Sequence, residues 1–145
     1  MEIQQMGMGR NILVAEDSPS YALLYKQIFE SRGHTVTVTN DGEECVASYK
    51  NMTANSDARQ FDMVILDYSM PKKNGLETAK EILQIRPDQR ILFISSFGDE
   101  LTPKLRALSN GINIDVLEKP FNSQSLIQKV EFEIEGQVPT GLVLQ

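Results

Sequence analysis

Short apolar runs alternate along this chain with segments whose apolar residues recur every three or four positions. The short runs predict five β-strands, over Asn11–Ala15, His34–Thr39, Phe61–Leu66, Ile91–Ser95 and Ile114–Leu117. Two of them contain the sequences "MVIL" and "ILFI", which are apolar throughout, as strands buried on both faces of a sheet usually are. The pattern therefore favours a central parallel sheet.

The segments between and after these strands predict five helices, because each combines an apolar stripe with a residue that starts or stops a helix. The boundaries are Ser18-Pro19 and Asp41-Gly42 before the first two helices, Pro87 after the third, Asn110-Gly111 after the fourth (Leu101–Leu108), and Pro120 before the fifth. Strict alternation of strands and helices is typical of βαβ units. Right-handed crossovers then predict a doubly wound α/β fold with helices on both faces of the sheet.

The length of the chain suits a single domain. At 145 residues, of which 41% are hydrophobic, it can bury a substantial core. We expect a flexible arm over residues 1–9, one domain over residues 10–135, and a tail or the start of a linker over residues 136–145.

Charge, hydropathy and cysteine content narrow the class of protein. No apolar run is long enough to cross a bilayer and the first ten residues do not resemble a secretory signal, so no membrane partner is expected. The net charge of -6 argues against direct, nonspecific binding of nucleic acid, which relies on clustered Lys and Arg. Cys45 is the only cysteine, which suits a reducing cytosol, and we expect a cytoplasmic protein.

Polar residues stand where four of the predicted strands end. They are Glu16-Asp17 after the first strand, Asp67 after the third, Ser95 in the fourth and Lys119 after the fifth. Ligands of open α/β sheets bind beyond the carboxyl ends of the strands. Three carboxylates there would repel one another, and Mg²⁺, a hard cation with oxygen ligands, would relieve that repulsion. With a hydroxyl and an ammonium beside them, the set predicts a site where an aspartate accepts a phosphoryl group.

Each motif at these strand ends is weak alone, but their order and spacing are specific. The motifs are Glu16-Asp17, Asp67-x-x-Met70-Pro71 with Gly75, Ser95, and Lys119-Pro120-Phe121, spread over about residues 10 to 135. Together they resemble the receiver domain of two-component response regulators, the CheY-like family. The resemblance implies a flavodoxin-like three-layer sandwich of five βα units, (βα)5, with strand order 2-1-3-4-5.

The resemblance also implies a role for each residue. Asp67 would be the phosphoacceptor, and Ser95 and Lys119 would contact the phosphoryl group. The Mg²⁺ ligands would be Glu16, Asp17, Asp67 and the backbone carbonyl of Ser69, with Asp17 favoured over Glu16 as a direct ligand. Lys119-Pro120 would be a cis peptide bond.

Two positions depart from the family pattern. Val116 stands where the fifth strand usually has a switch aromatic, which calls into question an aromatic rotamer coupled to Ser95. Phe97 is a bulky apolar residue two positions past Ser95. We hypothesise that Phe97 screens the phosphoryl group from attacking water and lengthens the phosphorylated lifetime.

The function implied is that of a regulatory phosphoacceptor rather than an enzyme acting on a substrate. A histidine kinase or phosphotransfer protein would phosphorylate Asp67, and a downstream protein would recognise the surface of the fourth helix, fifth strand and fifth helix, including Arg106, Val116 and Gln128. Dimerisation through the last helix stays open.

Three alternatives remain. The first is a receiver that signals by binding alone. The second is a Mg²⁺-dependent phosphatase that forms an aspartyl phosphate, although Ser69 stands where such hydrolases have a second acid. The third is a flavin-binding domain of the same topology, although no Gly-rich phosphate loop follows the first strand.

Overall fold

Five strands and their connecting helices alternate along the chain in the computed structural model, which describes residues 9–96, 103–105, 107–109 and 113–135. The elements are β1 (Asn11–Ala15), α2 (Pro19–Glu30), β2 (Thr35–Thr39), α3 (Gly42–Ala54), β3 (Met63–Asp67), α4 (Gly75–Ile85), β4 (Ile91–Ser95), the 3₁₀ turn η1 (Ala107–Ser109), β5 (Ile114–Glu118) and α6 (Ser123–Glu135). The strands form one parallel sheet in the order β2-β1-β3-β4-β5, which confirms the predicted flavodoxin-like order 2-1-3-4-5.

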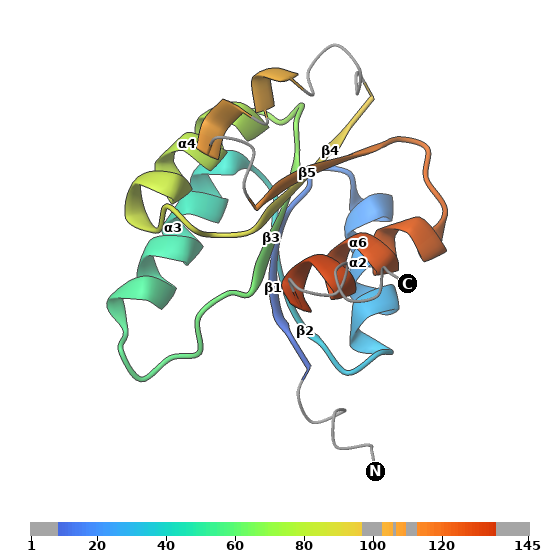
Figure 1. Ribbon diagram of the computed structural model, residues 1–145, viewed down its shortest axis with the longest axis horizontal. Helices are drawn as coiled ribbons and strands as arrows, with labels where there is room; N and C mark the ends of the chain where they lie inside the picture. Colours follow the sequence, from blue (N-terminus) through green and yellow to red (C-terminus); the bar gives the residue numbers. More distant parts are fainter. Residues whose placement is uncertain (1–8, 97–102, 106, 110–112, 136–145) are drawn as a thin grey trace, which may run out of the picture.

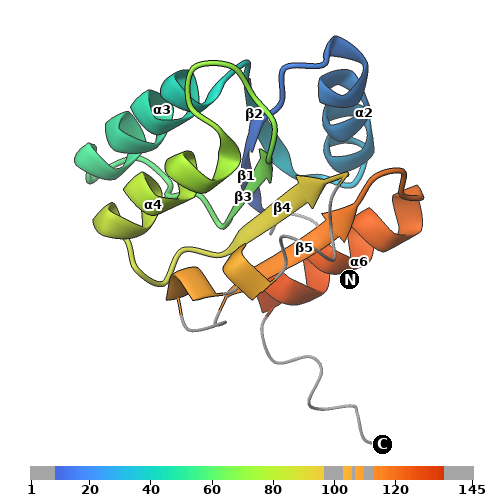
Figure 2. The same cartoon turned by 90° about the horizontal axis from the view of Figure 1, so that it is seen from above.

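The sheet lies between two layers of helices (Figure 1). Helices α3 and α4 cover one face and α2 and α6 cover the other, as the view from above also shows (Figure 2). Because side chains alternate across a strand, each central strand contributes to both cores. Leu13 and Val64 are buried in the cluster under α3 and α4, whereas Val14 and Ile65 are buried in the cluster under α2 and α6. The predicted three-layer sandwich is therefore confirmed.

Four boundaries, in three of the strands, differ from the predictions by one or two residues. The second strand begins at Thr35, not His34, and the fifth ends at Glu118. The third begins at Met63 rather than Phe61 and ends at Asp67. Asp67 is therefore the last residue of a strand that is buried along its whole length, not a turn residue after it.

Some predicted features fall outside the described residues. Of the helix predicted over Leu101–Leu108, residues 103–105 are described as helical, and the 3₁₀ turn η1 follows them. Arg106, Phe97 and the predicted tail lie outside the description, as does the predicted arm apart from Gly9. In the part of the chain that is described, no helix has both the length and the apolar character needed to cross a bilayer.

A capping box starts α4, directly after the loop that follows Asp67. The Asn74 side chain accepts a hydrogen bond from the Glu77 backbone N–H at 2.9 Å, and the Glu77 carboxylate accepts one from the Asn74 N–H at 3.0 Å. These bonds satisfy two backbone donors that a helix start would otherwise leave open.

Replacing Asn74 by alanine is expected to lower the free energy of unfolding by about 1 kcal/mol, because alanine cannot cap the helix. Urea unfolding followed by circular dichroism measures the loss. Asn74→Asp is the matched control, since aspartate caps as well as asparagine. Equal stability of the alanine and aspartate variants would show that the box contributes nothing.

An ion-pair cluster joins α6 to the end of α2. The Arg32 guanidinium donates two hydrogen bonds to Glu131, at 2.5 and 2.8 Å, and His34 Nε2 lies 3.0 Å from the same carboxylate. The backbone N–H of Arg10 donates to His34 Nδ1 at 2.8 Å, so in the neutral ring Nε2 carries the proton and donates to Glu131. The hydrogen bonds from Arg32 lower the pKa of Glu131 below its ordinary 4.5.

Glu131→Gln is expected to reduce stability at pH 7 by less than about 1 kcal/mol, because the pair is partly exposed to solvent. A carboxylate whose pKa is lowered by folding stabilises the protein above its unfolded pKa, and the gain is lost as the pH falls through the folded value. The difference between the variant and the parent protein should therefore shrink as the pH falls below 4.5. Urea unfolding between pH 3 and 7 tests this. A difference that stays constant over that range would argue against the charge as its source.

Candidate functional site

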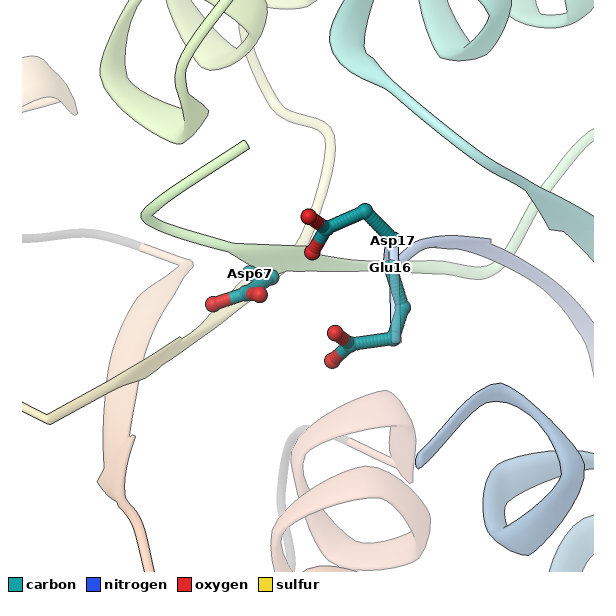
Figure 3. A group of neighbouring side chains, drawn as sticks. All are labelled: Glu16, Asp17 and Asp67. Atoms are coloured by element: carbon teal, nitrogen blue, oxygen red, sulfur yellow. The ribbon is translucent and has the colours of Figure 1, made fainter. Parts of the chain in front are cut away.

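Three carboxylates meet at the carboxyl edge of the sheet because two neighbouring parallel strands end there. Glu16 and Asp17 directly follow β1, and Asp67 closes β3, which pairs with β1 so that Ala15 lies opposite Leu66. Figure 3 shows the three side chains at these strand ends, with the carboxylates of Glu16 and Asp17 turned toward the side on which Asp67 lies. One oxygen from each carboxylate lies within 4.8 Å of one oxygen from each of the others.

The three carboxylates differ in exposure. Glu16 is 1% exposed and Asp67 is 7% exposed, whereas Asp17 is exposed. Hard anionic oxygen ligands at this spacing are the donor set that Mg²⁺ prefers, and the exposed Asp17 leaves one side open to the waters that Mg²⁺ retains. The residues present therefore fit the metal that sequence analysis predicts.

Burial and a neighbouring charge perturb the ionisation of the Glu16 carboxyl. Burial and the neighbouring Asp67 charge, in that order, raise the pKa of Glu16 from 4.5 to about 7. The backbone N–H of Ser18 donates to Glu16 Oε2 at 3.1 Å and partly opposes the rise. Tyr25 donates its hydroxyl to Oε1 at 3.4 Å. Without a cation, the cluster therefore holds a proton near neutral pH, and a bound cation would displace it.

Lys119 brings the positive charge to this edge. Its Nζ lies 3.6 Å from Asp67 Oδ2 and 3.5 Å from Glu16 Oε1, and the side chain is 16% exposed. Its backbone N–H donates to the carbonyl of Ser95 at 2.9 Å, which fastens the end of β5 to the end of β4. The Lys119-Pro120 peptide bond is cis, as predicted.

Of the remaining predicted site residues, the structure describes Ser69, Ser95 and Val116. Ser95 is the last residue of β4, the strand next to β3, and is buried. Ser69 is exposed in the loop two residues past Asp67. Val116 is half-buried on β5 and packs against the core under α3 and α4. Phe97 is outside the described residues.

An aromatic group at the edge of the site was not predicted from the sequence. Tyr21 and Tyr25 on α2 and Phe121 after Lys119 lie with ring centroids 5.8 to 6.2 Å apart. The Lys119 ammonium lies 4.1 Å from the centre of the Tyr21 ring. The sequence did contain a signal: two tyrosines are spaced i, i+4, and the first of them comes four residues after Asp17. The apolar stripe of the helix masked this signal, because packing in the core also explains aromatic residues there.

A large cavity among the described residues lies away from this site. It has a volume of about 850 Å³ and is lined by residues that precede β3 and β4, among them Phe61, Asp62 and Arg90. Those residues belong to the amino edge of the sheet, opposite the carboxylates. The clustered charges, and not the volume of the cavity, therefore identify the functional edge.

Comparison with known proteins gives consistent matches. The family model described as response regulator receiver domain matches residues 12–131. The chain is 31% identical over 119 residues to the transcriptional regulatory protein CpxR of Klebsiella pneumoniae. The matched stretch covers 82% of this chain and 47% of CpxR. The chain is also 28% identical over 122 residues to the chemotaxis protein CheY of Thermotoga maritima. Here the matched stretch covers 83% of this chain and 94% of CheY. Among solved structures, the receiver domain of Francisella response regulator 1452 has a TM-score of 0.70 and 26% identity, covering 88% of this chain and 98% of that one.

The family model extends across the acidic cluster and nearly the whole sheet, since it spans residues 12–131. The chain spans about half the length of CpxR and nearly the whole of CheY. Because CpxR is a transcriptional regulatory protein, the expected absence of a nucleic-acid partner stays a prediction. The family match, the strand order and the clustered carboxylates agree, and the chain belongs to the response regulator receiver domain family of two-component signalling.

Proposed function

We propose that Asp67 accepts a phosphoryl group from a histidine kinase or phosphotransfer protein, in a reaction that requires Mg²⁺. One observation carries the proposal: Asp67 closes a buried strand with two other carboxylates within 4.8 Å and the Lys119 ammonium 3.6 Å from its Oδ2. A carboxylate held between acids and a cation at the open edge of a sheet has partners for both a metal and an anion.

In the proposed reaction, an Asp67 carboxylate oxygen attacks the phosphorus of a phosphohistidine on the donor. The oxygen–phosphorus bond forms, the nitrogen–phosphorus bond breaks, and the leaving imidazole nitrogen takes up a proton. Lys119 offsets the charge of the transferred group, and Ser95 at the end of the adjacent strand donates a hydrogen bond to it. Glu16, Asp17, Asp67 and the backbone carbonyl of Ser69 would hold Mg²⁺, whose positive charge lowers the cost of bringing an anionic phosphoryl group to a carboxylate.

Phosphorylation would add about -1.5 to -2 units of charge beside Lys119 and Ser95. Because both residues lie at strand ends that are joined by a backbone hydrogen bond, their movement would reach β5 and α6 together. We propose that a downstream protein recognises this side of the domain, which includes the half-buried Val116 and the exposed Gln128. The domain would then act as a switch in the cytoplasm, with no substrate to turn over.

The decisive experiment is the intact mass of the protein after incubation with acetyl phosphate, with and without Mg²⁺, for the parent chain and for Asp67→Asn. We expect a gain of one phosphoryl group that needs both the metal and Asp67. A gain that survives in Asp67→Asn would contradict the assignment. No gain from a folded sample with several donors would favour a receiver that signals by binding alone.

A further inference from the structure

Three groups lie close to the Lys119 ammonium, and one of them carries no charge. Two are the carboxylates of Glu16 and Asp67, at 3.5 and 3.6 Å. The third is the aromatic ring of Tyr21, whose centre lies 4.1 Å from Nζ. A cation within about 6 Å of a ring centroid is attracted by the negative face of the ring. The ring and the phosphoacceptor carboxylate therefore contact the same ammonium.

The Tyr21 ring is itself held in place by other rings. It lies 5.8 Å from the ring of Phe121 and 6.1 Å from that of Tyr25, and Tyr25 stacks on Phe121 at 6.2 Å. Phe121 is two residues past Lys119, so the segment that carries the lysine also packs against the ring beside its ammonium. Tyr21 is further fixed through its backbone, because Tyr21 N–H donates to the side chain of Ser18, the residue that caps α2.

We propose that Tyr21 is a positioning residue that holds the Lys119 ammonium beside Asp67 for the incoming phosphoryl group. The inference rests on the proposed function of Asp67. A lysine side chain has four rotatable bonds, and fixing it in advance removes part of the entropy cost of binding an anion. The ring can do this because it attracts the cation without adding negative charge, whereas a further carboxylate would repel the phosphoryl group.

The first test reads the position of Lys119 without any phosphorylation or metal. In the metal-free protein, the ring current of Tyr21 should shift the Lys119 ε-CH₂ protons upfield of those of the other lysines in NMR spectra. Tyr21→Phe should keep the shift, because phenylalanine also offers a ring face. Tyr21→Leu should abolish it while leaving the other methyl and amide signals of a folded protein. Unshifted Lys119 protons in the parent protein would overturn the proposal.

The second test is a double-mutant cycle on the rate of phosphorylation by acetyl phosphate at saturating Mg²⁺. Tyr21→Leu should lower the second-order rate constant about fivefold, equivalent to about 1 kcal/mol, and Tyr21→Phe should retain it within about twofold. In a Lys119→Met background, Tyr21→Leu should have no further effect, since the ring would have no ammonium to hold.

The outcomes separate this inference from the function on which it rests. If the parent protein is not phosphorylated, the proposed function fails, and the NMR shift still decides whether the ring holds Lys119. If the parent protein is phosphorylated but Tyr21→Leu reacts at the parent rate, the positioning role is wrong and the function stands. A fivefold loss that persists in the Lys119→Met background would show that the ring only supports packing.

Discussion

Replacing Glu16 by glutamine is expected to make the metal-free protein more stable at pH 8, by about 2 kcal/mol, even though the change removes a residue of the functional site. Folding raises the pKa of Glu16 from 4.5 to about 7, which corresponds to about 3 kcal/mol at 1.36 kcal/mol per unit. That shift already includes the opposing attraction of Lys119, 3.5 Å from Glu16 Oε1. The expected gain is set lower, at about 2 kcal/mol, because an amide does not reproduce every hydrogen bond of the protonated carboxyl.

The expected effect has a definite pH window. An acid with a raised folded pKa binds its proton more tightly in the folded state, so stability falls as the pH rises from the unfolded value of 4.5 toward the folded value of about 7. Urea unfolding in the presence of a chelator should show this fall for the parent protein and not for Glu16→Gln. Added Mg²⁺ should raise the stability of the parent protein more than that of the variant, because the charged carboxylate of Glu16 binds the metal. A parent protein whose stability is flat between pH 4.5 and 7 would refute the perturbed titration.

Replacing Gly42 by alanine is expected to destabilise the fold by up to about 3 kcal/mol, the upper range for overpacking a well-packed site. A Cβ atom at this first position of α3 would lie 2.3 Å from the backbone carbonyl oxygen of Lys73 and 2.3 Å from Thr78 Oγ1. The carbonyl belongs to the loop between β3 and α4, so α3 and that loop would have to separate. A loss of stability would be informative, because alanine normally stabilises a helix relative to glycine by about 1 kcal/mol.

The control for Gly42→Ala is Glu43→Ala, one position further along the same helix, where the side chain is exposed. We expect the Glu43 variant to stay within about 0.5 kcal/mol of the parent protein. Both are measured by urea unfolding with the slopes compared, so that a change in the unfolded state is recognised. Equal stability of the two variants would mean that the loop after β3 accommodates the extra atom without cost.

The sequence predicts the layers of this fold well because periodicity and capping act locally. Ser18 caps α2 and Asp41 caps α3, at the residues that were expected to start these helices. The strand order could not be predicted in this way, because no local pattern says which strands are neighbours. The predicted order came from the family resemblance. The end of β3 was misplaced because aspartate disfavours strands, whereas the pairing of Asp67 with Ile94 extends the strand through it.

The candidate site divides in the same way. The convergence of Glu16, Asp17 and Asp67 follows from strands that end at one edge, so it could be predicted without coordinates. The contact between Tyr21 and Lys119 could not, because the two residues are far apart in sequence and meet only through the packing of α2 against the segment after β5. A tyrosine on the apolar stripe of a helix is usually explained by packing in the core. Only the distance between the Tyr21 ring and the Lys119 ammonium distinguishes this packing role from the role of positioning the lysine.

The burial of Cys45 turns the only thiol into a reporter of local opening. The side chain is fully buried between α3 and the sheet, and burial raises its pKa to about 12, so the folded protein offers almost no thiolate to a reagent at neutral pH. Alkylation can then proceed only through molecules in which α3 has moved away from the sheet. The rate of alkylation, compared with that of a free thiol, measures how rarely this opening happens. Any ligand that binds at the carboxyl edge should lower the logarithm of that rate in proportion to the stability it adds to this layer.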